Sequence, residues 1–230
     1  MNERLQNATF FPPVETALAD PNGLLAMGGD LSAERLLDAY RHGIFPWFNP
    51  GEPILWWSPD PRMVLLPGDI RVTRSLAKRM RNGGFELRID SAFVDVMRAC
   101  GAPRDGAAGT WISEAMVAAY SRLFDAGYAH SVETWHDGRL VGGLYGVAIG
   151  RMFYGESMFS RKPDASKIAL VRLAQQLQQW AFGMIDCQME TAHLSSMGAR
   201  TLPRAAFVAR LAELVNWPHR PGPWTFDSPD

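Results

Sequence analysis

The stretch from Ala129 to Met158 constrains the fold most, because it has the pattern of consecutive antiparallel strands. Asp137-Gly138 is a strong two-residue hairpin signal within it, and Gly150 marks the next chain reversal. Strands joined by turns this short pair with each other. The second half of the chain is therefore expected to contain an antiparallel sheet.

The segments around these strands alternate between helix and strand periodicity. A strand is predicted over Phe85 to Ile89, and three helices are expected to begin at the capping residues Thr73, Ser91 and Ser113. After the meander we expect a helix from about Asp164 to Trp180, a strand from Met184 to Glu190 and a last helix from near Pro203. Antiparallel strands followed by helix, strand and helix predict an α+β fold.

The first sixty-odd residues differ in character, since they are dense in proline, glycine and tryptophan. One helix stands out among the turns, with Ser32 as its N-cap and Gly43 at its end. We expect a small N-terminal domain over residues 1–64 and a larger domain over residues 65–230.

Composition excludes several classes of protein. The 23 Lys and Arg residues nearly cancel the 24 Asp and Glu residues, so any contact with a polyanion must come from local clustering. Cys100 and Cys187 are too few for a disulfide scaffold. Met1 to Pro13 lacks the features of a signal peptide, and the apolar runs are far shorter than the ~20 residues that span a bilayer. We expect a cytoplasmic monomer with no membrane association.

Two polar pairs lie in segments otherwise suited to burial. Strand alternation places Asp186 and Gln188 on one sheet face and Ile185 on the other, and it also places Tyr154 and Glu156 together. A pair such as Asp186 and Gln188 is usually a solvated face. A buried Glu156 needs a partner, which could equally be a structural contact, for example with Arg161, or a functional one.

Aromatic and basic residues form two further patterns. Trp47 and Trp111 lie beside prolines or in loops, where tryptophan usually packs but can also stack on a nucleobase. A stretch without acidic residues carries a basic stripe, which is either a solvated helix face or a contact for a phosphate backbone. The stripe consists of Arg74, Lys78, Arg79 and Arg81.

Familiar cofactor and nucleophile motifs are missing. The chain has no Walker loop, no dinucleotide fingerprint and no Gly-x-Ser-x-Gly elbow, and its five histidines lack zinc-ligand spacing. We therefore expect no metal and no cofactor, and a reaction that uses an already activated substrate.

Read in order, six motifs resemble one family, that of the bacterial leucyl/phenylalanyl-tRNA–protein transferases. The motifs are PNGLLA at 21–26, GGDL at 28–31, GIFPWF at 43–48, LWWSPDPR at 55–62, FYGESMFS at 153–160 and IDCQ at 185–188. The resemblance implies a small N-terminal domain and a C-terminal domain similar to the GNAT acyltransferases. It also implies transfer of Leu or Phe, and less readily Met, from aminoacyl-tRNA to proteins that begin with Arg or Lys, which marks these proteins for degradation.

The resemblance also implies roles for individual residues. Asp186 would act as a base or an electrostatic anchor for the incoming amine, Gln188 would hold the reacting groups, and Glu156 would bind the basic N-terminal residue or the amine. Trp47 and Trp111 would hold the terminal adenosine. The acyl pocket would be lined by Phe153, Met158 and Ile185, with Leu144, Leu173 and Leu194 at positions expected to differ within the family.

Two alternatives remain at this point. A GNAT-like fold would also suit an acetyl-coenzyme A-dependent N-acyltransferase, although no glycine-rich turn precedes the helix that starts near Asp164. A non-catalytic RNA-binding module would explain the basic stripe and the tryptophans but would leave Asp186 and Gln188 without a role.

Overall fold

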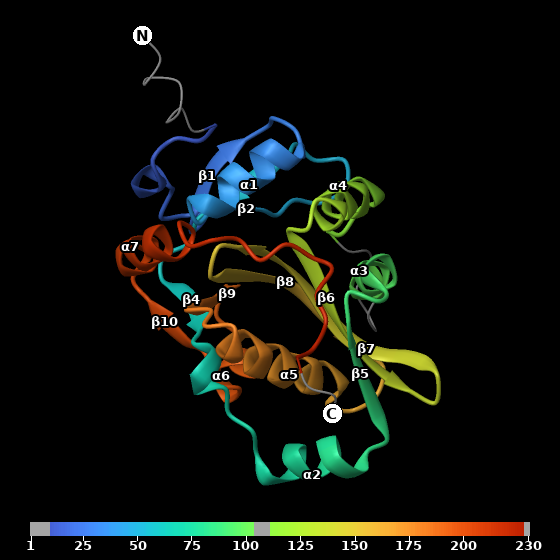
Figure 1. The fold of residues 1–230 in the computed structure, drawn as a ribbon. Coiled ribbons are helices and arrows are strands. Elements are labelled where there is room, and N and C mark those ends of the chain that lie inside the picture. The colour runs from blue at the N-terminus through green and yellow to red at the C-terminus, as the bar shows by residue number, and fades with distance from the viewer. Residues whose placement is uncertain (1–9, 104–110, 228–230) are drawn as a thin grey trace.

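The computed structural model describes residues 10–103 and 111–227, and it contains two sheets (Figure 1). The strands are β1 (Leu24–Met27), β2 (Phe45–Pro46), β3 (Leu55–Trp57), β4 (Arg62–Leu65), β5 (Phe85–Ile89), β6 (Ala129–His136), β7 (Arg139–Ile149), β8 (Met152–Ser160), β9 (Met184–Gln188) and β10 (Arg200–Leu202). The helices are α1 (Ala33–Arg41), α2 (Arg74–Asn82), α3 (Phe93–Gly101), α4 (Glu114–Asp125), α5 (Ala165–Gln179), α6 (Ala192–Ser196) and α7 (Arg204–Leu214), with 3-10 turns at Val14–Thr16 and Pro67–Asp69.

The large sheet has seven strands in the order β10-β4-β9-β8-β7-β6-β5, and β1, β3 and β2 form a small separate sheet. All pairs in the large sheet are antiparallel except β8 with β9, which is parallel. The α+β class and the small N-terminal unit are therefore confirmed. β4 pairs with β9 and β10, so residues 62–65 belong to the large sheet.

The central hairpins follow from local chemistry. Asp137 and Gly138 both have positive φ angles (50° and 68°), as a tight two-residue hairpin turn requires, and Gly150 (φ 58°) joins β7 to β8. The strand meander predicted between Ala129 and Met158 is confirmed as β6, β7 and β8.

Most helix starts are as expected. The hydroxyls of Ser32, Thr73 and Ser113 each accept a hydrogen bond from the backbone N–H three residues later, so these three caps are confirmed. Ser91 was expected to cap α3, and this is wrong. Its hydroxyl donates to Glu133 Oε2 (2.8 Å) instead, and α3 starts after Ala92 without a side-chain cap.

Both faces of the large sheet are covered, one by α5 and the other by α3, α4 and the N-terminal unit. α5 packs on one face, where Ile168, Leu173 and Leu177 join Phe153 and Ile185 in one apolar cluster. On the other face α1, α3, α4 and the small sheet share a second cluster (Figure 1). The site described below lies where strands of the large sheet separate between these two layers.

The segment after α7 returns across the molecule to the α5 side. The Trp224 side chain is buried there and stacks on His130, with ring centroids 3.4 Å apart. Its backbone N–H donates to Asp90 Oδ2 (2.6 Å), which also contacts His130 Nδ1 (2.8 Å). The segment after α7, called the tail below, thereby contributes Trp224 to the apolar cluster that also contains α5.

Candidate active site

A cavity opens where β8 and β9 separate. The two strands pair only from Met152 to Tyr154 on β8 and from Met184 to Asp186 on β9. Beyond these residues the ladder ends, and both strands contribute to the wall of a cavity of about 700 Å³. A cavity between diverging parallel strands gives a substrate access to backbone and side chains from both strands.

Glu156 enters this cavity from a β-bulge. Tyr145 on β7 pairs with Ser157, whereas the next residue, Gly146, pairs with Gly155. Glu156 is therefore the extra residue of β8, without a partner in the ladder. A bulge of this kind bends the strand and redirects a side chain, which is why bulges are frequent beside active sites.

The cavity wall is mostly apolar. Phe153 and Ile185 are buried residues of this wall, and Trp47, which also lines the cavity, is 41% exposed. Other lining residues include Trp111, Leu144, Met158, Leu170, Leu173 and Leu194. All five side chains predicted for the acyl pocket and the adenosine thus line one cavity, as do the three leucines expected to vary. The ligands assigned to them remain predictions.

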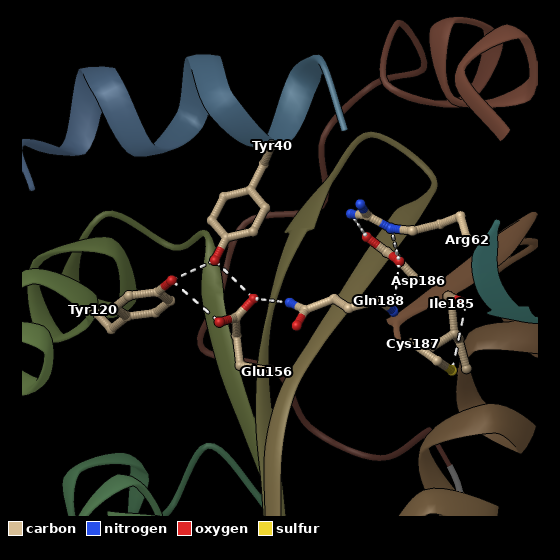
Figure 2. A network of polar contacts seen from close by, with 8 residues as sticks. All are labelled: Tyr40, Arg62, Tyr120, Glu156, Ile185, Asp186, Cys187 and Gln188. Carbon is tan, nitrogen blue, oxygen red and sulfur yellow. Dashed lines mark hydrogen bonds and ion pairs between the residues drawn. The ribbon is translucent and has the colours of Figure 1, made fainter. Parts of the chain in front are cut away.

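The carboxyl of Glu156 contacts three side chains from different elements (Figure 2). Tyr40 of α1 donates to Oε1 over 2.7 Å, and Gln188 Nε2 donates to the same oxygen over 2.9 Å. The Tyr120 hydroxyl of α4 lies 3.2 Å from Oε2, and the two tyrosine hydroxyls also hydrogen-bond to each other. The N-terminal unit therefore supplies one partner of the carboxyl directly.

The electrostatic environment of Glu156 favours its neutral form. The surrounding protein shields the carboxyl from bulk water, and this burial raises the pKa of Glu156 from 4.5 to about 7. The hydrogen bonds from Tyr40 and Tyr120 and the charge of Arg62 lower the pKa of Glu156, whereas the charge of Asp186 raises it further. Glu156 can therefore change protonation state close to neutral pH.

Asp186 is held by a buried ion pair. Arg62 donates from Nε to Oδ1 (2.8 Å) and from Nη2 to Oδ2 (2.6 Å), and both side chains are 1% exposed. The guanidinium lies between the rings of Phe45 and Phe207, at 4.8 and 4.7 Å from their centroids. Asp186 is not part of the cavity wall. Whether Asp186 acts on the incoming amine as a base or as an electrostatic anchor stays a prediction.

Gln188 connects this ion pair to Glu156. Its backbone N–H donates to Asp186 Oδ1 (2.9 Å), while its side-chain amide reaches Glu156. Gln188 has a φ of +61°, a left-handed conformation that ends β9 two residues earlier than the predicted end at Glu190. Asp186 and Gln188 lie on the Tyr40 side of the sheet, as alternation predicts, with Cys187 on the other side (Figure 2).

The basic stripe lies outside the cavity, on the exposed surface of α2. Arg74, Lys78 and Arg81 are exposed, while Arg79 forms an ion pair with Asp164 (3.3 Å) and donates to the Pro163 carbonyl (3.2 Å). Arg79 is therefore partly neutralised by a residue that is distant in sequence. The contact places α2 beside the start of α5.

Sequence reasoning missed three members of the polar network, namely Tyr40, Tyr120 and Arg62. Helix periodicity alone places Tyr40 and Tyr120 on the apolar faces of their helices, as core residues. The available signal was their hydroxyl groups, since a buried tyrosine usually finds a hydrogen-bond partner.

Two classes of feature are absent from the described parts of the chain. Residues 10–103 and 111–227 contain no group of three His, Cys, Asp or Glu side chains placed to hold a metal ion. No helix in these ranges has the length and apolar character that would let it cross a membrane.

Comparison with known proteins points to one family. Residues 64–212 match the family described as leucyl/phenylalanyl-tRNA protein transferase, and residues 29–60 match its N-terminal domain. Leucyl/phenylalanyl-tRNA–protein transferases from Thiobacillus denitrificans and Nitrosomonas europaea are 82% and 63% identical to this chain. Each alignment covers 99% of this chain, and the two cover 100% and 96% of the respective relatives.

One solved structure to which the chain is similar is a distant match. A GCN5-related N-acetyltransferase from Kribbella flavida is 13% identical, with a TM-score of 0.34, over 73% of this chain and 59% of that one.

Proposed function

Because this chain belongs to the leucyl/phenylalanyl-tRNA–protein transferase family, we propose that it transfers Leu or Phe, and less readily Met, from aminoacyl-tRNA to acceptor proteins. The acceptors begin with Arg or Lys, and the added residue marks them for degradation. The observation that carries this proposal is the cavity itself, which combines an apolar wall with the Glu156 and Gln188 pair.

The apolar wall suits the side chain of the transferred amino acid. Phe153, Met158 and Ile185 offer apolar surface to leucine, phenylalanine or methionine. A pocket of this type selects by shape and burial, so it discriminates modestly between similar apolar side chains and strongly against charged ones. Trp47 and Trp111, on the same cavity, can stack on the terminal adenosine.

The reaction requires the enzyme to position the acyl ester and the incoming amine more than to activate either of them. The acyl group is already an ester of the tRNA 3′ end, so attack by a neutral amine forms the amide and releases the ribose hydroxyl. The amine loses one proton and the leaving oxygen gains one. Gln188 orients the reacting groups, Glu156 faces the cationic acceptor, and Asp186, paired with Arg62, fixes the turn that carries Gln188.

The exposed cations of α2 supply a surface for the tRNA body. Arg74, Lys78 and Arg81 face solvent, and the ion pair of Arg79 joins α2 to the start of α5, whose Ser166 lines the cavity. We place the enzyme in the cytoplasm as a monomer. Cys100 and Cys187 form no disulfide, which fits a reducing compartment.

A transfer assay tests the proposal. Labelled leucyl-tRNA, an Arg-initiated protein and the enzyme should yield labelled protein, and a Gly-initiated version of the same protein should not. Acetyl-coenzyme A, tested in parallel as acyl donor, should give no product. Transfer to both proteins alike, or acetylation in place of leucylation, would refute the proposal.

A further inference from the structure

The three contacts that join Glu156, Tyr40 and Tyr120 need three protons. Each is an oxygen-to-oxygen hydrogen bond: Tyr40 to Oε1, Tyr120 to Oε2, and Tyr40 to Tyr120. Each tyrosine carries one hydroxyl proton, and an ionised carboxylate carries none. If Glu156 is ionised, only the two tyrosine protons are available for the three contacts. One of the three pairs of oxygen atoms then has no hydrogen between them. With Glu156 protonated, each contact has its own proton.

Of the two directions that the protons of a neutral carboxyl can take around these contacts, one keeps both donors of Oε1 in place. Oε1 receives two donors, Tyr40 and Gln188 Nε2, which suits a carbonyl oxygen with two lone pairs. Oε2 lies 3.2 Å from the Tyr120 hydroxyl, which donates to an ionised carboxylate and accepts instead when Oε2 carries the acid proton. The protons then run in one direction around the ring, from Oε2 to Tyr120, from Tyr120 to Tyr40 and from Tyr40 to Oε1.

Charged neighbours do not force the carboxyl to ionise. Within residues 10–103 and 111–227, no lysine, arginine or histidine forms an ion pair with Glu156. Asp186 on β9 disfavours a second negative charge nearby, and Arg62 on β4, which has the opposite effect, already pairs with Asp186. The groups contributed by α1 and α4 are the two tyrosines, and β7 contributes Tyr145, also uncharged at neutral pH.

We propose that Glu156 is protonated in the resting enzyme, that Tyr40 and Tyr120 are positioning residues which hold this proton in a closed ring, and that the proton leaves when a cationic acceptor binds. The last part rests on the proposed function. The carboxyl proton passes to solvent, the carboxylate pairs with the cation of the acceptor, and the charge of the site is balanced before and after binding. A neutral resting carboxyl avoids a partly buried negative charge without a cationic partner while the acceptor is absent.

Infrared spectroscopy tests the resting state directly. The wild-type enzyme at pH 6 should show the carbonyl band of a protonated carboxyl, and the difference from Glu156→Gln identifies it. The band should fade with a midpoint at pH about 7. If the difference spectrum at pH 6 shows only a carboxylate, the proposal is overturned. Because this measurement needs no substrate, an enzyme that transfers leucine but lacks the band overturns this proposal alone.

The Tyr120→Phe variant distinguishes the ring from an arrangement in which Tyr120 only donates a hydrogen bond to an ionised Glu156. In the ring the Tyr120 hydroxyl accepts the hydrogen bond from the protonated carboxyl. Removing this hydroxyl destabilises the neutral form of Glu156 and should lower the pH midpoint of the carbonyl band. If Tyr120 only donated to a carboxylate, the same change would raise the midpoint, and the ring would be refuted. Tyr154→Phe is the matched control, since its buried hydroxyl has no hydrogen-bond partner in the described chain. This variant should leave the midpoint unchanged.

Calorimetry with an Arg-initiated peptide tests the release of the proton. At pH 6, titrations in buffers with different ionisation enthalpies should show nearly one proton released per peptide bound, and at pH 8 nearly none. The release at pH 6 should disappear in Glu156→Gln. Binding without proton release at pH 6 would overturn the link between the acceptor and the ring.

Discussion

The Arg62 guanidinium is buried between two aromatic rings, and Asp186 neutralises its charge. Asp186→Ala leaves this cation buried without a counter-charge, so we expect it to lower the free energy of unfolding by about 3–5 kcal/mol. Transfer should fall with it, because Gln188 loses the acceptor that fixes its backbone. Urea unfolding and the transfer assay measure the two effects.

The double variant Arg62→Met with Asp186→Leu is the control for this experiment. Apolar replacements of a buried ion pair are often neutral for stability, so the double variant should be more stable than Asp186→Ala. Transfer should nevertheless stay low, since Gln188 is still unanchored. Full activity in the double variant would show that Asp186 does not position Gln188.

Glu156 makes the stability of the protein depend on pH. The carboxyl loses its proton near pH 4.5 in the unfolded chain and at about 7 in the folded one, so the folded state binds more protons between these values. Its contribution to stability is complete below pH 4.5 and is lost as pH rises through about 7, by at most about 3–4 kcal/mol. Urea unfolding of the wild type and Glu156→Gln from pH 5 to 8 checks this. A difference between them that grows with pH in favour of the wild type would contradict the sign.

Part of the site could be predicted from sequence, and part depends on tertiary structure. Strand alternation placed Asp186 and Gln188 on one face but favoured a solvated face for them, and only the family resemblance assigned these two residues and Glu156 to a site. The partners of these residues could not be predicted from local pattern. Tyr40 lies 116 residues from Glu156 along the chain, and Arg62 lies 124 residues from Asp186.

At the scale of one element, α2 presents cations whose neighbours in the helix carry no negative charge. We expect Arg74→Ala with Lys78→Ala to weaken tRNA binding and to reduce the slope of log affinity against log salt by about two units, one for each phosphate contact. Transfer from a short aminoacyl-adenosine should persist, because such a donor reaches only the cavity.

The control for α2 removes the same number of charges elsewhere. Arg98 and Arg210 are exposed and already face Glu114 and Glu213, so Arg98→Ala with Arg210→Ala should leave the salt slope unchanged. Filter binding over a range of salt concentrations measures both double variants. If the two double variants had equal slopes of log affinity against log salt, the cations of α2 would be a solvated helix face without phosphate contacts.

Helix caps show where local prediction works and where it fails. Ser32, Thr73 and Ser113 cap their helices because the hydroxyl has a nearby backbone N–H and no stronger partner. Ser91 has such a partner in the buried carboxyl of Glu133, on a strand 42 residues later. The end of β9 was also misplaced, because the left-handed conformation of Gln188 depends on its contact with Asp186.

At the scale of the whole molecule, the tail after α7 contributes to stability although it matched no motif. Trp224 is 3% exposed and packs against His130, Trp180 and Phe182. We expect Trp224→Ala to lower the free energy of unfolding by about 3–5 kcal/mol. Affinity for tRNA, measured well below the unfolding transition, should not change. Wild-type stability in this variant would show that the tail is dispensable for the fold.

The position of Arg62 has a consequence for how the enzyme is made. Its guanidinium needs Phe45 from the N-terminal unit, Asp186 from β9 and Phe207 from α7. A ribosome delivers these segments in order, and α7 leaves the exit tunnel long after the small sheet. We therefore expect nascent chains that still lack α7 to hold the Arg62 guanidinium against one ring instead of two, and so to anchor Gln188 less firmly than the full chain does.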